Sequence, residues 1–215
     1  MPNHVTNKIS KEVAALLKND GGDIDFNVIT PMPKQLIDPD PQQMDVRTKA
    51  VMGLFSKSNS GLESIEIDTA IRLMFEPLKA DQVDLLISAI RNIHLYGFTH
   101  WYPWANRFWG TKWNAYNHHV YDEFETFDTA WSCPIPIFIK LSELNPKLTI
   151  MVEYADEDSG SNCGTIVYKN GELISSHTSP QWSTLDNAEK EYWLRFALGL
   201  TDPDNIDERL ADYLE

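Results

Sequence analysis

Aromatic side chains that could stack on a ligand are concentrated in one part of this chain. Five of the seven tryptophans lie between Trp101 and Trp131, in the run WYPWANRFWGTKWNAYNHHVYDEFETFDTAW. Rings at this density either build a hydrophobic core or present flat faces to nucleic-acid bases or sugars. The candidate binding residues within the run are Trp109, Lys112, Trp113, Tyr116 and His118.

The charge around this run favours a core over a base-stacking surface. Arg107 and Lys112 are its only lysine or arginine residues after His100. A protein that binds a phosphate backbone needs a basic patch or stripe. We therefore expect no direct binding of nucleic acid, and we interpret the run mainly as a structural core.

Acidic side chains accumulate towards the C-terminus. Residues 151–215 hold 14 acidic and 4 basic side chains, so this segment carries −10 of the net charge of −14. Such a field repels phosphate and attracts basic proteins. The sequence therefore predicts a basic partner protein, with Asp156, Glu157 and Asp158 as candidate docking residues. It leaves the oligomeric state open.

Metal, cofactor and nucleophile signatures are weak in this sequence. His118 and His119 are adjacent, and Cys133 and Cys163 lie outside the short paired spacings of zinc sites. The chain has no G-x-S-x-G, no phosphate-binding loop and no dinucleotide fingerprint. We expect neither a metal nor a cofactor. The question of catalysis stays open, with a non-enzymatic protein favoured.

An enzymatic alternative remains. In it, the segment from Trp109 to His118 lines the pocket of a hydrolase or a small-molecule binder. Trp109, Trp113, Tyr116 and His118 would form the lining, and Glu125 or Asp128 would supply the polar group. Paired carboxylates are effective only when both face one cleft, a condition that sequence does not reveal.

The composition indicates an ordinary globular protein. Of 215 residues, 42% are hydrophobic and 23% are charged, which suits a single compact unit over residues 1–215. No apolar run is long enough for a membrane span, and the N-terminus lacks the apolar segment of a secretory signal. We therefore expect a cytoplasmic protein that does not associate with membranes.

The order of elements predicts an α+β fold of the ferredoxin-like, or split βαβ, type. An antiparallel sheet carries helices on one face, and C-terminal helices follow. A strand at 4–9, a helix at 11–19 and a strand at 24–28 begin the pattern. The expected parts are 1–98, with a helical insertion around 44–96; 99–182, an aromatic-rich sheet with a hairpin at Asn170-Gly171; and 183–215, the C-terminal helices.

Four motifs occur in an order that suggests a known family. They are MPNHVTNKIS at 1–10, WGTKWNAY at 109–116, TAWSCPIPIFIKLSELNP at 129–146 and VEYADED at 152–158. Together they resemble the YubB-like (phage Api-like) family of uncharacterised phage- and plasmid-encoded proteins. The resemblance implies a ferredoxin-like C-terminal domain and carriage on a mobile element. Cys133 and Ile135, on either side of Pro134, depart from the proline-rich stretch expected there.

The resemblance brings no catalytic residue to this chain. The sequence therefore favours a non-enzymatic accessory protein of a mobile genetic element that binds a basic host or mobile-element protein. In its narrowest form, the hypothesis is an acidic DNA mimic that inhibits a host protein.

Overall fold

The computed structural model describes residues 3–37 and 80–214. The chain divides into two compact units, Met1–Pro31 with Ala105–Glu215 and Met32–Trp104. The expected insertion at 44–96 is helical in its described part, α4 (Ala80–Tyr96), and residues 44–79 lie outside the described residues. None of the described helices is long and apolar enough to cross a membrane.

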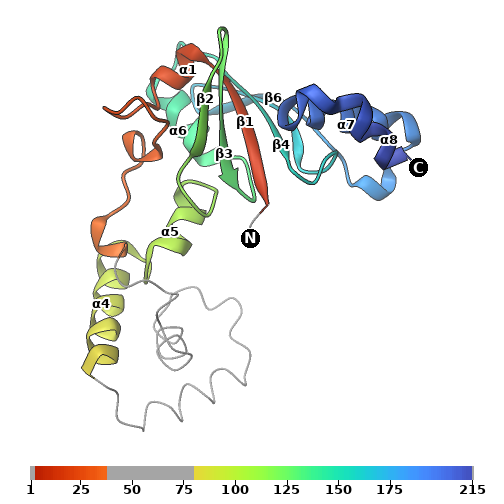
Figure 1. Ribbon diagram of the computed structural model, residues 1–215. Helices are drawn as coiled ribbons and strands as arrows, with labels where there is room; N and C mark the ends of the chain where they lie inside the picture. The colour runs from red at the N-terminus through yellow and green to blue at the C-terminus, as the bar shows by residue number, and fades with distance from the viewer. Residues whose placement is uncertain (1–2, 38–79, 215) are drawn as a thin grey trace. The chain divides into compact units, whose positions relative to one another are not determined.

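All six described strands belong to the first unit and form one antiparallel sheet. Their order is β2-β3-β1-β4-β5-β6, and Figure 1 shows β2, β3, β1 and β4 following one another in this order. The strands are β1 (His4–Ser10), β2 (Tyr116–Val120), β3 (Phe124–Ala130), β4 (Ile150–Asp156), β5 (Cys163–Lys169) and β6 (Glu172–Thr178). β1 is central because it pairs with both β3 and β4, and Asn7 lies opposite Phe127 on one side and Tyr154 on the other.

This strand order confirms the predicted α+β, ferredoxin-like fold. The elements β1, α1 (Lys11–Ala15), β2, β3, α6 (Ile135–Leu144) and β4 follow the βαββαβ sequence. Because β1 lies between β3 and β4 and is antiparallel to both, β3, α6 and β4 form the split βαβ unit. β5 and β6 extend the sheet beyond β4. Their turn has positive φ at Asn170 (52°) and Gly171 (78°), as expected for the predicted hairpin.

The expected strand at 24–28 is wrong. Ile24 forms only an isolated bridge with Lys18, and Phe26–Val28 is a short 3₁₀ helix. The carboxylate of Asp25 accepts a hydrogen bond from the backbone N–H of Asn27, which closes a turn instead of leaving this N–H for a ladder. The strand that completes the ferredoxin-like sheet is β2, which is about one hundred residues further along the chain than β1.

The aromatic-rich part is also less uniformly β than expected. It begins with a helix, α5 (Trp101–Phe108), before the sheet resumes at β2. Tryptophans of this run therefore occupy a helix, a loop and a strand end, and one role does not describe them all.

The two faces of the sheet differ. On one face Val5, Asn7 and Ile9 are buried, and α1 and α6 contribute buried side chains to the core. On the other face His4, Thr6 and Lys8 are only partly buried. This second face is covered near β4 and β5 by α7 (Asn187–Thr201), whose Trp193 and Ala197 pack with Ala155 and Cys163. A part of the second face around β1, β2 and β3 therefore carries polar side chains.

The C-terminal helices are held by local signals that the sequence contains. Asp186 and Glu189 form a reciprocal capping box at the start of α7. Gly199 does not end this helix, which continues to Thr201. Pro203–Asn205 then forms a 3₁₀ turn that leads into α8 (Ile206–Leu214).

Candidate functional site

The motifs WGTKWNAY and TAWSCP, which are about twenty residues apart, meet at the end of β3. The hydroxyl of Thr111 donates to the carbonyl of Ala130 at 2.8 Å and accepts from the N–H of Ala130 at 3.1 Å. The hydroxyl of Ser132 donates to the carbonyl of Gly110 at 2.5 Å. Thr111 is 1% exposed, so these bonds are shielded from water. The two motifs are therefore one structural unit.

Gly110 is required where this unit approaches α6. Its φ is +76°, and a Cβ atom there would lie 2.5 Å from Cδ of Pro136. Neither the backbone conformation nor the space admits a larger residue. The WG pair thus fixes the loop against the first turn of α6.

Trp131 has a left-handed backbone that bulky residues rarely adopt. Its φ is +71°, a conformation that costs on the order of 1–2 kcal/mol for a residue with a Cβ. Its N–H donates to the carbonyl of Asn3 at 2.9 Å, and its carbonyl accepts from the side chain of Asn162 at 3.0 Å. The side chain is nevertheless 43% exposed. Strain that displays a large side chain at the surface points to a role for that side chain.

The ammonium of Lys112 lies over two exposed indole rings. Its Nζ atom is 4.6 Å from the ring centroid of Trp113 and 4.9 Å from that of Trp131. Both distances lie within the range of cation–π attraction. Trp113 is 37% exposed, and its ring meets Tyr116 edge-on at 6.3 Å. We call the set Lys112, Trp113, Tyr116 and Trp131 the lysine–indole surface.

Tyr116 anchors this surface to the sheet. Its hydroxyl is 2.7 Å from Nδ1 of His4 and donates to the carbonyl of Thr129 at 3.3 Å. Burial, reinforced by the carboxylates of Asp128 and Glu157, raises the pKa of Tyr116 to about 12. The phenol is therefore neutral at physiological pH and acts as a hydrogen-bonding group.

The predicted acidic residues lie beside the lysine–indole surface and differ in role. Asp156 is 5% exposed, and its carboxylate accepts hydrogen bonds from Asn3, Asn162 and the N–H of Asp158. Because Asn3 and Asn162 also hold the backbone of Trp131, Asp156 supports the exposed indole. Glu157 and Asp158 are exposed. Among the described residues, no group of three or more histidines, cysteines or carboxylates could hold a metal ion.

Trp109 lies apart from this surface. It is 4% exposed, its Nε1 donates to the carbonyl of Thr30 at 2.9 Å, and its ring packs edge-on against Phe26. It is therefore a core residue. The structure does not bring it together with Trp113, Tyr116 and His118 in one lining.

His118 belongs to a different cluster. A register shift between Tyr116 and His119 interrupts β2, and Nε2 of His118 lies 2.7 Å from Oε2 of Glu125. The other carboxylate oxygen of Glu125 accepts from Lys18 at 2.7 Å. Burial alone would raise the pKa of Glu125, but hydrogen bonds and charges from Lys18 and His118 outweigh it and lower the pKa. Glu125 is therefore an ionised, clamped carboxylate, 2% exposed.

Asp128, the other acidic residue considered for a pocket, lies on the polar face of the sheet. It accepts from the hydroxyl of Thr6 at 2.9 Å and from the side-chain amide of Asn117 at 3.0 Å. It is close enough to influence Tyr116 but belongs to neither the Glu125 cluster nor the core.

Both cysteines are buried thiols. Burial raises the pKa of Cys133 well above its ordinary value. Burial and the nearby carboxylate of Asp156 raise the pKa of Cys163 to about 11, although the hydrogen bond with Ser179 acts the other way. Thiols in this state are poor nucleophiles.

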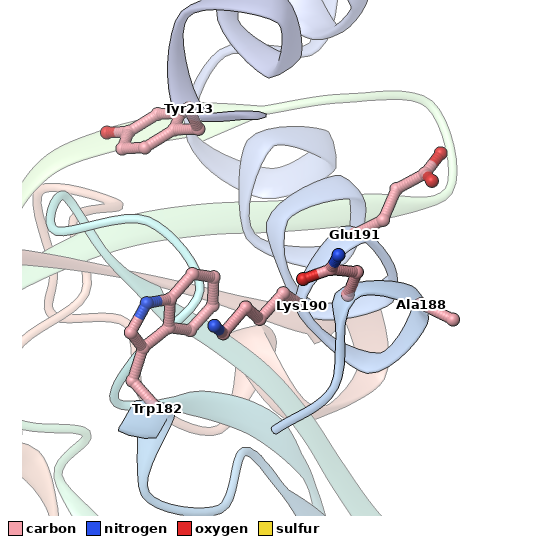
Figure 2. Close-up of a pocket in the computed structure, with 6 residues that line it drawn as sticks. Trp182, Ala188, Lys190, Glu191 and Tyr213 are labelled. Atoms are coloured by element: carbon pink, nitrogen blue, oxygen red, sulfur yellow. The ribbon is translucent and has the colours of Figure 1, made fainter. Parts of the chain in front are cut away.

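A hollow of about 550 Å³ opens between η3 (Trp182–Thr184), α7 and α8 (Figure 2). Its Lys190 ammonium lies 5.7 Å from the ring centroid of Trp182, and Tyr213 stands on the opposite side. Asn187, Ala188 and Glu191 complete the lining. This lysine faces one indole, in contrast to the two rings around Lys112.

Sequence reasoning missed Trp131, His4, Asn3 and Asn162 as members of the site. Trp131 stood out only as the end of the tryptophan run. The available signal was the pairing of WGTKWNAY with TAWSCP as the two most distinctive motifs. The left-handed backbone conformation of Trp131, in contrast, cannot be predicted from the sequence.

A comparison with protein-family models agrees with this fold. Residues 108–194 match a family model described as the ferredoxin-like domain in Api92-like protein. The crystal structure of a protein Api92 from Yersinia pseudotuberculosis has a TM-score of 0.37 and 10% identity, and the match covers 84% of this chain and 99% of that one. No curated protein matches the chain. The matched residues include both motifs of the lysine–indole surface.

Proposed function

We propose that this chain is a non-enzymatic accessory protein of a mobile genetic element that binds a basic partner protein. The lysine–indole surface would be the contact. One observation carries the proposal: two exposed indoles, Trp113 and Trp131, already hold an ammonium group between them, that of Lys112. Trp and Tyr are enriched where proteins bind one another, and exposed aromatic pairs attract cations.

The charge of the surrounding chain supports a basic partner. Glu157 and Asp158 are exposed in the loop that supports Trp131. The segment 186–214, which we call the C-terminal acidic segment, adds the exposed carboxylates of Asp204, Asp207 and Glu208. Of these, Asp207 is paired with Arg195. Clustered carboxylates accelerate encounter with a basic protein and disfavour acidic competitors.

The narrower form of the proposal is DNA mimicry. Carboxylates of the C-terminal acidic segment would then take the place of phosphates in the basic groove of a host DNA-binding protein, and that protein would be inhibited. The net charge of −10 after residue 150 is the motivation. In this form, duplex DNA and the chain compete for the same groove.

A pull-down from host lysate at low and high salt tests the broad proposal. We expect the wild-type chain to retain a basic protein at low salt and release it at high salt, because screening weakens exposed charge pairs. Trp113→Ala and Trp131→Ala should lose that protein. Tyr121→Ala removes an aromatic ring that is 49% exposed on the β2–β3 turn, and it should retain the protein.

Two results would contradict the proposal. One is equal retention by wild type and both tryptophan variants. The other is an absence of any protein released by salt. If a protein is retained but excess duplex DNA does not displace it, DNA mimicry is excluded while the broad proposal stands.

A second candidate, a hydrolase or small-molecule binder, is favoured by the contact between His118 and Glu125. A histidine oriented by a carboxylate is a usual general base. A thermal-shift screen of small ligands tests it, since a bound ligand raises the melting temperature by mass action. A ligand that raises the melting temperature of His118→Ala as much as that of wild type does not bind at this site.

A further inference from the structure

We propose that Lys112 is an internal stand-in for an arginine side chain of the partner. The partner's guanidinium would insert between Trp113 and Trp131 and displace the Lys112 ammonium into solvent. This inference rests on the proposed function, because it names the group that the lysine–indole surface binds.

The occupied state of the surface shows which chemistry it accepts. The Lys112 ammonium lies over the faces of both rings, at 4.6 and 4.9 Å from their centroids. The negative faces of the two π-systems are therefore directed at a common point, and a cation fills it. An apolar or anionic ligand would gain nothing from this electrostatic arrangement.

Hydrogen bonds hold the chain segments that carry the two exposed indoles. Trp131 is held in its left-handed conformation by Asn3 and Asn162, and Asp156 accepts hydrogen bonds from both. Trp113 lies two residues after Thr111, whose hydroxyl is fixed to Ala130. The backbone of Trp131 and the loop that leads to Trp113 are thus held by hydrogen bonds, while Lys112 itself is a long side chain. None of these hydrogen bonds involves the Lys112 side chain, so its departure breaks none of them.

An arginine is better suited to this gap than the lysine that fills it. A guanidinium is planar and stacks on aromatic faces, and it is less strongly hydrated than an ammonium. It therefore loses less hydration on entering between two indoles. Its forked N–H groups also need an acceptor, and the exposed carboxylate of Glu157 lies near Tyr116, at the edge of the lysine–indole surface.

The test follows the indole N–H signals of Trp113 and Trp131 by NMR in the full chain. The probes are capped arginine amide, capped lysine amide and tetramethylammonium chloride. We expect arginine amide to shift both signals. In Lys112→Ala, half of the shift should be reached at an arginine amide concentration about two- to fivefold lower than in wild type, because one competing cation–π contact has been removed. Lys140→Ala removes an equal charge from an exposed position on α6, so its titration should match wild type.

Several outcomes overturn the inference. Lys112 is not a stand-in if Lys112→Ala binds arginine amide no more tightly than wild type. The surface does not select guanidinium if lysine amide or tetramethylammonium binds as well as arginine amide. If arginine amide fails to shift the signals but the tryptophan variants still lose the partner in the pull-down, only this inference fails. If the pull-down loses nothing, the proposed function itself fails.

Discussion

The hydroxyl of Thr111 and the backbone of Ala130 are joined by two hydrogen bonds, one in each direction. Through this pair, a loop residue occupies the position that a neighbouring strand would hold at the end of β3. The pair sets the distance between Lys112, which follows Thr111, and Trp131, which follows Ala130. The geometry of the lysine–indole surface thus depends on one buried hydroxyl.

Replacing Thr111 by valine should therefore weaken both stability and the surface. Valine keeps the shape but removes the hydroxyl, which leaves the N–H and carbonyl of Ala130 unpaired in a dry environment. We expect a loss of about 1–3 kcal/mol in the free energy of unfolding, measured by urea denaturation. Thr111→Ser retains the hydroxyl and should recover most of this loss. Equal stability of the valine variant and wild type would contradict a structural role for the pair.

The left-handed backbone of Trp131 predicts an unusual preference for glycine. Trp131→Gly should be more stable than Trp131→Ala by about 1 kcal/mol, since glycine adopts positive φ without strain. Trp113 is outside the set of positive-φ residues. At that position the order should reverse, because glycine adds unfolded-state entropy. The urea midpoints of the glycine and alanine variants at both positions measure these differences. If glycine and alanine ranked in the same order at Trp113 as at Trp131, backbone strain at Trp131 would be contradicted.

Two glycines should respond in opposite directions to alanine. Gly110→Ala meets Pro136 at 2.5 Å with φ at +76°, so we expect a loss of about 2–4 kcal/mol. Gly199 lies inside α7 with nothing within 4 Å of an added Cβ. Gly199→Ala should gain about 0.5–1 kcal/mol. Thermal melts of both variants measure these opposite changes in stability. A melting temperature of Gly110→Ala equal to that of wild type would contradict the prediction.

The clamped carboxylate of Glu125 predicts a pH-dependent contribution to stability. Its folded-state pKa is lowered from 4.5, so the contribution is present above that value and is lost as the pH falls through the folded pKa. Glu125→Gln should cost about 2 kcal/mol at neutral pH. The gap between variant and wild type should narrow as the pH drops below 4.5. Urea denaturation across this range measures it, and a gap independent of pH would contradict an ionised carboxylate.

The buried cysteines predict slow chemistry in the native state. Cys133 and Cys163 have raised pKa values and no exposed thiol. We expect both to resist an aromatic disulfide reagent at neutral pH and to react fully in denaturant. A rapid native phase corresponding to one thiol would mean that one of them is accessible.

Sequence alone predicted the elements that rest on local signals. Asn170-Gly171 identified its hairpin because positive φ suits those two residues. The C-terminal helices lie within the predicted range 183–215, and α7 begins there with the local capping box of Asp186 and Glu189. The position of β2 was not predictable in this way. About one hundred residues separate β2 from α1 in the sequence. No local pattern distinguishes β2 from the segment 24–28, which was wrongly predicted to be a strand.

The residues proposed from the sequence as a binding site lie in different places in the structure. Lys112, Trp113 and Tyr116 do lie together, with Glu157 close to Tyr116, whereas Trp109 is in the core and His118 is in another cluster. The alternation of residues along a strand shows which side chains share a face of the sheet only where the register is regular. In β2 the register shifts between Tyr116 and His119, so alternation fails there. Trp131 depends on Asn3, which precedes β1, and on Asn162, which lies between β4 and β5.

The central place of β1 has a consequence for how the protein is made. β1 is synthesised before both of its neighbours, β3 and β4, which follow it by more than one hundred residues. Until residues 150–156 have emerged from the ribosome, β1 cannot form backbone hydrogen bonds along both of its edges. Contacts of such long sequence separation slow folding and leave unpaired edges open to association. During translation, the edges of β1 therefore stay unpaired for a prolonged interval.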